Sequence, residues 1–491
     1  MNRRHLLQGL AGAAAATILT PELAQAAAQL KAGEAAGLDW RVAFADLEAD
    51  MPQTPMRLVE GRAPAGLTGS LYRNGPGKFH RPGGSVDHWF DGDGLMRAFR
   101  IDHGQATLAA RFIDTPKRRA DIAANAVVTP GFGTRAKPGS RVGSNDDVNA
   151  ANISVMPVGK EIWALWEGGS PIAMDAGDLS TKGIKTLGPD YAHMPFLAHP
   201  RREPGGDIWS LGLNGDKAIV WRLGGDGALK SADMVQLPAA SYVHDFSATD
   251  RHLILILQPW IQDKLVMPYA DSFSWKPELG TKVLVLDKSD LTKRRAYELP
   301  AFFAFHYGSA WEETDGTLRF DGCLSPDASF ATTNGRSLMN GVYTPEPSPM
   351  LTMFVLRPNG RASLERTRVA AEFPRTDGRF GGKARRYTIH ATHAGQGPLF
   401  HGYATHDWKT GKSDAFNLGP GQLVEEAVFV ARPGGADELD GWLLAPSVNV
   451  RAKATELHVF DARRVAAGPV CTWRADRALP VSLHGAFVAR G

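Results

Sequence analysis

The chain has 491 residues, of which 43% are hydrophobic and 22% charged, a composition typical of soluble globular proteins. Its formal net charge is only +3 and no basic block stands out, so the sequence predicts no nucleic-acid partner. Its 53 glycines and 32 prolines occur in turn-like clusters between short apolar runs, which indicates many short strands rather than long helices.

The first residues differ from the rest of the chain. Residues 2–8 contain the pair Arg3-Arg4, an Ala/Gly-rich apolar stretch extends from Gly9 to Leu19, and Ala24-Gln25-Ala26 offers a cleavage site between small residues. This pattern predicts a twin-arginine signal peptide over residues 1–26, and the apolar stretch is too short to span a bilayer comfortably. We therefore expect a bacterial periplasmic protein, with residues 27–60 as an N-terminal extension of the mature chain.

From residue 61 onward the sequence predicts a nearly all-β domain. Apolar and β-branched runs are bounded by Gly, Pro, Asp and Asn, and no further segment reaches transmembrane length. The clearest runs are 162–166, 208–213, 253–257, 351–356 and 442–444.

A weak repeat links these strands. Several end in Asp and have an apolar residue four positions later, as in 283–287 followed by Leu291 and 457–461 followed by Val465. Counting looser versions, seven such units occur between Asp102 and Asp461, with a mean spacing of about 60 residues, which is within reach of propeller blades that carry loop insertions. The count favours one closed seven-bladed β-propeller over residues 61–491 rather than several small domains.

Four histidines stand in distinctive local sequences, although they are far apart in the chain. They are His199 in Ala-His-Pro, His244 in Val-His-Asp-Phe, His306 in Phe-His-Tyr-Gly, and His484 in Leu-His-Gly. The inner strands of a propeller surround one axis, so histidines from four blades can converge there. Imidazole is a good ligand for iron, copper, zinc and nickel, so the four together predict a metal site.

At this point the sequence resembles the carotenoid cleavage oxygenase family, which includes apocarotenoid- and stilbene-cleaving enzymes. The resemblance runs from about Gly66 to the C-terminus. It is carried by the four histidine motifs and by Leu71-Tyr72-Arg73-Asn74-Gly75-Pro76-Gly77, His88-Trp89-Phe90-Asp91-Gly92-Asp93-Gly94 and Arg111-Phe112-Ile113.

The resemblance implies a seven-bladed propeller that holds a non-haem Fe(II) on its axis, with loops and short helices forming a cap over the iron face. The iron ligands would be His199, His244, His306 and His484. The family also places three glutamates behind the ligands, and the matching positions here are Glu167, Glu372 and Glu426, with Glu425 a competitor for the last. Their role agrees with the general rule that a metal-bound imidazole donates its other N–H to a carboxylate or carbonyl.

The implied reaction is the cleavage of a carbon–carbon double bond by O2 into two carbonyl products, on an apolar polyene such as a carotenoid or apocarotenoid. Stilbene-cleaving members use a Tyr shortly before the Arg-aromatic-aliphatic segment, where this chain has Leu108; this favours a polyene over a stilbenoid, the alternative substrate class. The family often has Asn where this chain has Ser309. Phe302, Phe303 and Phe305 are candidate tunnel residues, as are Trp260 and Trp275, and the segment 260–275 is a candidate membrane contact.

Other features have simpler interpretations. His390 and His393 are three residues apart, a spacing that points them to opposite faces of a strand, and His193 is a competing ligand without the His-Pro context. The turns at residues 73–76 and 91–94 are interpreted as structural. Cys323 and Cys471 allow one disulfide but no thiolate metal cage.

Two other functions remain open from the sequence. One is a metal-free propeller that binds a ligand or partner. The other is a hydrolase, although no Gly-x-Ser-x-Gly nucleophile motif is present. The oligomeric state cannot be read from the sequence.

Overall fold

The structure is a computed structural model that describes residues 38–490, except for residues 136, 138, 139, 141, 344–346 and 394–398. The signal peptide predicted over residues 1–26 lies outside the described residues. The described chain is nearly all β, as predicted, and its α-helices are short: α2 (Pro116–Ala123) and α3 (Gly335–Met339). None of its described helices is long and apolar enough to cross a membrane.

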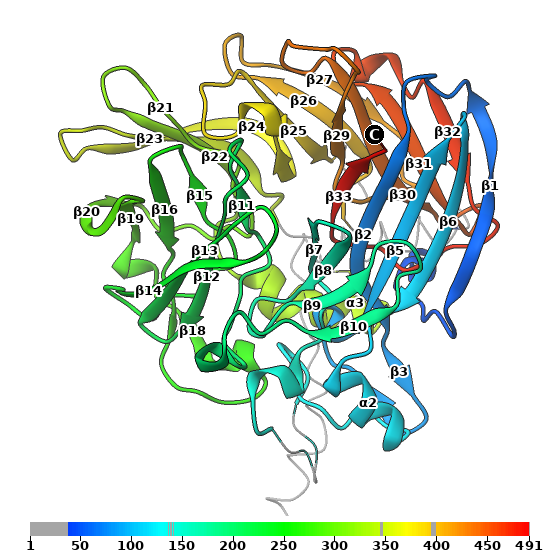
Figure 1. Cartoon of the computed structure of the whole chain (residues 1–491), viewed down its shortest axis with the longest axis horizontal. Coiled ribbons are helices and arrows are strands. Elements are labelled where there is room, and N and C mark those ends of the chain that lie inside the picture. The colour runs from blue at the N-terminus through cyan, green and yellow to red at the C-terminus, as the bar shows by residue number, and fades with distance from the viewer. Residues whose placement is uncertain are drawn as a thin grey trace, which may run out of the picture.

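Three separate four-stranded antiparallel sheets follow one another in the chain, and the sheets are arranged around a common centre (Figure 1). The first contains β7 (Ser154–Val158), β8 (Glu161–Leu165), β9 (Ile172–Asp175) and β10 (Thr181–Ile184). The second contains β11 (Arg201–Arg202), β12 (Ile208–Asn214), β13 (Lys217–Leu223) and β14 (Leu229–Gln236). The third contains β15 (Ser247–Ala248), β16 (His252–Leu257), β19 (Thr281–Asp287) and β20 (Asp290–Leu299).

A seven-stranded sheet comes next, and its strands pair in chain order. They are β21 (Trp311–Glu312), β22 (Leu318–Leu324), β23 (Met350–Leu356), β24 (Ala362–Arg375), β25 (Tyr387–Thr392), β26 (Gly402–Asp407) and β27 (Lys412–Asn417). The long strand β24 pairs with β23 over its first part and with β25 over its last part, so it joins two groups of strands.

The largest sheet has ten strands and contains both ends of the described chain. Its path runs β28-β30-β31-β32-β1-β6-β5-β2-β33, with β29 also paired to β30. The strands are β1 (Met51–Gly61), β2 (Gly69–Lys78), β5 (Asp93–Asp102), β6 (Gln105–Phe112), β28 (Gln422–Val424), β29 (Val428–Ala431), β30 (Gly441–Asn449), β31 (Ala454–Asp461), β32 (Cys471–Arg474) and β33 (His484–Ala489).

Strand β1 has a joining role like that of β24. Its first half pairs with β6 and its second half with β32. Met51 and Met56 are buried in the core beneath this sheet. The last part of the segment interpreted as an N-terminal extension, residues 27–60, therefore belongs to the sheet, and the packed domain begins before residue 61.

The sheets pack face to face, and strand β16 shows why residues 253–257 are continuously apolar. All six of its residues are buried. Leu253 and Leu255 contact the core shared with β12 and β13, whereas Ile254 and Ile256 contact the core shared with β22 and β23. Because successive side chains of a strand point to opposite faces, a strand between two neighbouring sheets must be apolar at every position. Burying each such side chain stabilises the fold by about 1.5–3 kcal/mol.

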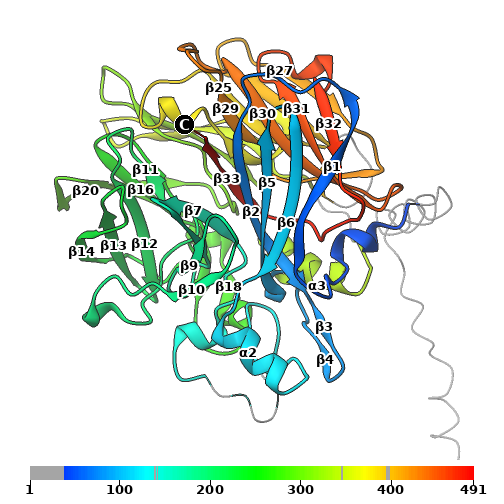
Figure 2. The same ribbon diagram turned by 45° about the vertical axis from the view of Figure 1, so that its right-hand side comes forward.

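The connections between strands gather on one side of the sheets. Figure 2 shows α2, α3 and β18 (Phe273–Trp275) together on that side, with the hairpin of β3 (His80–Arg81) and β4 (Gly84–Ser85). Strand β17 (Trp260–Gln262) pairs with β18, and the 3-10 segment Trp89–Asp91 and the π-helical turn Phe330–Asn334 lie next to α3.

The two cysteines do not form the disulfide that the sequence allowed. Cys323 lies in β22 and Cys471 in β32, and both are free and buried. They belong to different sheets and to different core clusters, so their thiols cannot meet. Burial raises the pKa of Cys471 to about 12, and both behave as small apolar core residues.

Candidate metal centre

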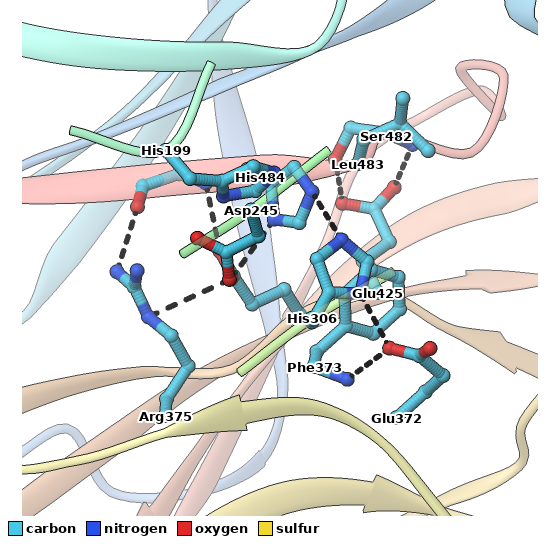
Figure 3. A network of polar contacts seen from close by, with 12 residues as sticks. His199, Asp245, His306, Glu372, Phe373, Arg375, Glu425, Ser482, Leu483 and His484 are labelled. Atoms are coloured by element: carbon cyan, nitrogen blue, oxygen red, sulfur yellow. Dashed lines mark hydrogen bonds and ion pairs between the residues drawn. The ribbon is translucent and has the colours of Figure 1, made fainter. Parts of the chain in front are cut away.

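The four histidines selected from the sequence meet at one point. His199 precedes β11, His244 precedes β15 and His484 begins β33. His306 lies between two short bridges to the segment around β22, Phe303 to Ser325 and Tyr307 to Gly322. One nitrogen from each ring lies within 4.8 Å of the others. The strand starts of four sheet segments therefore face a common centre. Figure 3 shows three of the four rings from close by, those of His199, His306 and His484.

The spacing of the nitrogens suits a metal ion. Nε2 of His199 lies 3.0 Å from Nε2 of His244, and Nε2 of His306 lies 3.1 Å from Nε2 of His484. Imidazole nitrogens bind metals such as zinc at about 2.0–2.1 Å, so two ligands at right angles have nitrogens about 3.0 Å apart. The pairs match the distance between neighbouring ligands of one ion.

Three carboxylates determine which ring nitrogens carry protons. Nδ1 of His244 lies 2.9 Å from Glu167, Nδ1 of His306 lies 2.6 Å from Glu372, and Nδ1 of His484 lies 3.0 Å from Glu426. A carboxylate can only accept, so each Nδ1 donates and the neutral ring presents the lone pair of Nε2. The lone pairs of these three rings thus point to the same small space, which a nitrogen of His199 also faces. This arrangement requires a cation as its partner.

The carboxylates are themselves held by the backbone and by neighbouring side chains. Glu372 accepts from its neighbour Phe373 N at 2.6 Å (Figure 3), and Glu167 accepts from Tyr242 Oη at 2.8 Å. Glu426 accepts from Gly485 N at 2.9 Å. Burial opposes its charge, but Arg375, 3.5 Å away, and the adjacent His484 hold the pKa of Glu426 below its usual range. These contacts fix the orientation of each carboxylate.

Burial favours the neutral form of two of the ligand rings, those of His199 and His484. Burial is the main cause that lowers the pKa of His199 well below its usual value and that of His484 to about 3. Burial acts in the same direction on His306, but the charge of Glu372 outweighs it and raises the pKa of that ring. A neutral imidazole is the form that binds metals.

A second layer of contacts ties the histidine segments together. Asp245 follows His244 and accepts from Arg201 at 2.6 Å and from Tyr307 N at 2.9 Å. Arg201 lies close to His199 in sequence and also donates to the carbonyl oxygens of Phe246 and Tyr307. One ion pair therefore links three of the four ligand segments.

A cavity of about 770 Å³ reaches this cluster. His244, His306 and His484 are part of its wall, together with Glu167 and Glu372. The wall also contains several aromatic residues: Trp89, Phe90, Phe132, Phe305, Phe330 and Phe373. Such a mainly apolar cavity with a few polar groups is typical of a small-molecule site.

Comparison with known proteins identifies the family. The family described as "Retinal pigment epithelial membrane protein" matches residues 44–489. The chain belongs to this family, the carotenoid cleavage oxygenases. The resemblance seen in the sequence motifs is thereby confirmed.

Individual members of this family are similar over almost their whole length. The apocarotenoid-15,15'-oxygenase of Synechocystis is 27% identical, over 87% of this chain and 92% of that protein. Resveratrol cleavage oxygenase 1 of Aspergillus fumigatus is also 27% identical, over 90% and 93%. The structure of cobalt-substituted Synechocystis apocarotenoid oxygenase superposes with a TM-score of 0.83 at 23% identity, covering 92% of this chain and 98% of that one. The sequence-based expectation of an oxygenase agrees with these names.

Several other residues singled out from the sequence of this carotenoid cleavage oxygenase lie outside the metal centre. His193 pairs with Asp146 at 2.8 Å, and His390 is buried within β25. Glu425 hydrogen-bonds to Ser482 N at 2.8 Å and pairs with Arg73, so Glu426 alone of the two contacts a ligand ring. The sequence could not separate these adjacent carboxylates, whereas the structure does.

The inference from Leu108 does not hold. Leu108 is buried in β6 among core residues of the ten-stranded sheet and is not among the described residues that line the cavity. Its side chain cannot contact a substrate there, so it does not discriminate between a polyene and a stilbenoid. The candidate tunnel residues lie in two different environments. Phe305 lines the cavity, whereas Phe302, Phe303 and Trp260 are core residues.

The turn predicted at residues 73–76 is wrong, because these residues lie within strand β2 and pair with β5. The motif at residues 91–94 does have a structural role: the carboxylate of Asp91 accepts from the backbone of Phe132, Gly133 and Thr134. The loop that carries the cavity residue Phe132 is held in this way. Ser309 accepts from Gly382 N at 3.1 Å and does not touch the histidines. Tyr242, Asp245 and Arg201 were not selected from the sequence, although the last two stand directly beside histidine motifs.

The adjacent pair of glutamates offers a matched test of the metal centre. Glu426→Gln removes the charge that orients His484 and is expected to weaken iron binding about 10- to 100-fold, measured by competition with a chelator. Glu425→Gln leaves buried Arg73 and Arg97 with less countercharge and is expected to lower the melting temperature while the folded protein retains its iron affinity. Equal losses of iron affinity in both variants would contradict the assigned roles.

Proposed function

We propose that the protein is an iron-dependent oxygenase that cleaves a carbon–carbon double bond of a carotenoid or apocarotenoid. One O2 would provide both carbonyl oxygens of the two products. The observation that carries this proposal is the convergence of four imidazoles at the wall of a large aromatic cavity, in a chain that belongs to this family.

The proposed architecture is a seven-bladed propeller. Strand β24 divides the seven-stranded sheet into two groups, and β1 divides the ten-stranded sheet into two more. With the three four-stranded sheets, this gives seven groups of four or more strands when β1 and β24 are each counted in both groups that they join. The last strand, β33, pairs with β2, so the C-terminus would complete the first blade and close the ring. The structural likeness to the Synechocystis oxygenase supports the same architecture.

The proposed metal is Fe(II), held by His199, His244, His306 and His484. When bound there, iron would supply the O2 chemistry, since four imidazoles leave up to two positions of an octahedral shell open. The ligand set contains no thiolate and no directly bound carboxylate, so it is unlike a closed structural zinc site. The three glutamates would act through the rings and not on the metal.

The rest of the site would position the alkene and exclude water. Phe305 lies 5.3 Å from the ring of His244, and Phe373 lies 5.2 Å from the ring of His306, between ring centres. These aromatic faces favour an apolar, flat substrate next to the cluster. A dry cavity that aligns one double bond lowers the entropic part of the barrier and prevents side reactions.

The size of the cavity favours a long substrate. Its volume of about 770 Å³ lies in the upper part of the range of ligand pockets. A stilbenoid is the second candidate, because the resveratrol-cleaving relative is as similar in sequence as the apocarotenoid-cleaving one. Leu108 does not bear on this choice.

Labelled oxygen tests the reaction and the substrate together. Iron-loaded protein is incubated with carotenoids, apocarotenoids and stilbenes under ¹⁸O2, and the products are identified by mass spectrometry. We expect a polyene to be cleaved with label in both carbonyl products, since no water needs to enter the dry cavity. Anaerobic samples and His306→Ala are expected to be inactive, and cleavage that persists without O2 would refute the oxygenase.

We also propose export through the twin-arginine route, because the sequence of residues 1–26 fits such a signal and a folded metal protein requires such a route. Expressed in a bacterium, the protein is expected in the periplasmic fraction with an N-terminus at Ala27. Replacing Arg3-Arg4 by Lys-Lys is expected to leave it uncleaved in the cytoplasm. Unchanged processing of that variant would exclude this route.

A peripheral membrane contact is proposed at the mouth of the cavity. Leu265 is 76% exposed, and three other residues of the cavity wall are exposed apolar residues: Val142, Val266 and Met267. They lie partly within the segment 260–275 that the sequence suggested. Exposed apolar residues around a cavity entrance would let an apolar substrate pass from a bilayer without crossing water.

Liposome sedimentation tests this contact. Leu265→Glu is expected to reduce binding to phosphatidylcholine vesicles several-fold, because a charge at the interface opposes insertion. Met234→Glu is the control, since Met234 is 66% exposed in β14 and does not line the cavity. An equal effect of both substitutions would argue against a specific contact at the mouth.

A further inference from the structure

The segment that carries Glu372 and Phe373 departs from regular strand geometry. From Glu372 to Arg375 strand β24 advances by three residues, whereas its partner β25 advances by only two, from Ala391 to Ile389. Strand β24 therefore has one extra residue here, which makes a β-bulge. Bulges are common next to active sites, where they change the direction in which a side chain points.

The backbone of Phe373 lies in the left-handed region, with a φ of 56°. In the part of the chain that the structure describes, nine residues other than glycine have a positive φ, and Phe373 is the only Phe, Tyr or Trp among them. This conformation is unfavourable for an L-residue with a bulky side chain. A residue that is held in such a conformation by its surroundings is typical of functional sites.

The left-handed conformation brings two neighbouring side chains to the same site. Successive side chains of a regular strand point to opposite faces, so with Glu372 directed at His306 the next side chain would point away from the histidines. Here both line the cavity. The ring centre of Phe373 lies 5.2 Å from that of His306 and 5.4 Å from that of His484 (Figure 3). The amide of Phe373 donates to Glu372 at 2.6 Å, so one residue holds a carboxylate behind the centre and places a ring in front of it.

A second phenylalanine lies against the same ligand ring. The ring centre of Phe305 is 6.0 Å from that of His306 and 5.3 Å from that of His244. Phe305 and Phe373 thus share His306, but beyond it Phe305 contacts His244 and Phe373 contacts His484. Both also line the cavity. A flat apolar molecule next to the cluster would therefore meet an aromatic ring on the side of each ligand pair.

We propose that Phe373 is a specificity-determining residue, whose ring positions the double bond that is cleaved. The inference rests on the proposed function and adds to it the residue that selects the bond. A polyene contains many similar double bonds, so its chemistry alone does not choose among them, and the wall next to the metal centre must do so. Phe373 suits this role because a flat ring packs well against a conjugated chain, and its backbone is fixed by β24 and by Glu372.

The test identifies the products that iron-loaded protein forms in air from one apocarotenoid of defined length. Phe373→Leu removes the aromatic face but keeps a large apolar side chain and the amide that binds Glu372. We expect the ratio of the main product pair to all other cleavage products to fall about 2- to 10-fold, the range that one aromatic contact contributes. Iron affinity, measured by competition with a chelator, is expected to stay unchanged.

Phe416→Leu is the matched control. Phe416 is also half-buried, but it lies in β27 and is not among the described residues that line the cavity. This variant is expected to retain the wild-type product ratio.

Binding provides a readout without turnover. Under nitrogen, the Kd values of the polyene and of its saturated analogue are measured from quenching of tryptophan fluorescence, since Trp89 and Trp166 line the cavity. We expect the wild-type protein to prefer the polyene, because its flat conjugated chain packs against the ring. Phe373→Leu is expected to reduce this preference about 2- to 10-fold.

A second pair of variants tests the strained backbone. Phe373→Ala and Phe373→Gly both remove the ring and keep the amide, but only glycine adopts a positive φ without strain. We therefore expect the glycine variant to have the higher melting temperature. An equal or lower melting temperature would contradict the left-handed conformation on which the inference rests.

The outcomes separate the role of Phe373 from the proposed function. If cleavage occurs and the product ratio is unchanged in Phe373→Leu, or falls equally in Phe416→Leu, the role of Phe373 is refuted while the oxygenase stands. A loss of iron affinity in Phe373→Leu would also refute it, because the ratio would then reflect a disturbed metal centre. If the wild-type protein cleaves no polyene, the proposed reaction fails and the binding preference decides: its persistence in Phe373→Leu refutes the role of Phe373, and its loss supports it.

Discussion

The hydrogen bond from an imidazole Nδ1 to a buried carboxylate is the interaction on which the metal centre depends. It occurs three times, at Glu167, Glu372 and Glu426, and each time it leaves a lone pair on Nε2. Without it the rings could rotate or carry their proton on the inner nitrogen, and a metal would bind less tightly. The carboxylates therefore define the metal centre as much as the ligands do.

Keeping these carboxylates ionised inside the protein requires further charges. Glu426 and Glu425 are both buried, and Arg73, Arg97 and Arg375 lie within 3.3–3.5 Å of one or the other. Breaking such a buried network is costly, because each charge left without its partner has lost its hydration. The metal centre is thus continuous with a network that also links β2, β5 and β33 in the ten-stranded sheet, and the chemistry and the stability of that sheet depend on the same residues.

Features that depend on neighbouring residues in the sequence could be predicted, whereas features that depend on contacts between distant segments could not. The run at residues 253–257 is recognisable as a strand because it is apolar at every position. The four histidines could be selected because each stands in a distinctive local sequence. The sharing of β1 and β24 between groups of strands could not be foreseen, since it follows from pairing between distant segments.

The incorrect predictions have the same origin. Leu108 was aligned with a substrate-binding position, but a residue's side of a strand depends on its pairing, and β6 directs Leu108 into the core. Whether the cysteines are bonded was left open for the same reason, because nothing in the sequence shows that β22 and β32 are in different sheets. Asp245 and Arg201 illustrate the converse case. Their neighbours in sequence are ligands, yet their role appears only when three distant segments meet.

The placement of residues also explains why the family is easier to assign than the substrate. The ligands stand at the starts of strands or on short bridged segments, where the backbone is fixed by neighbouring sheets. Much of the cavity wall, by contrast, comes from connections: the loop around Phe132, the turn at Phe330, and the segment 262–267. Loops tolerate substitution because few backbone contacts depend on them. Substitutions in these loops can therefore change the shape of the cavity without disturbing the backbone that holds the four histidines.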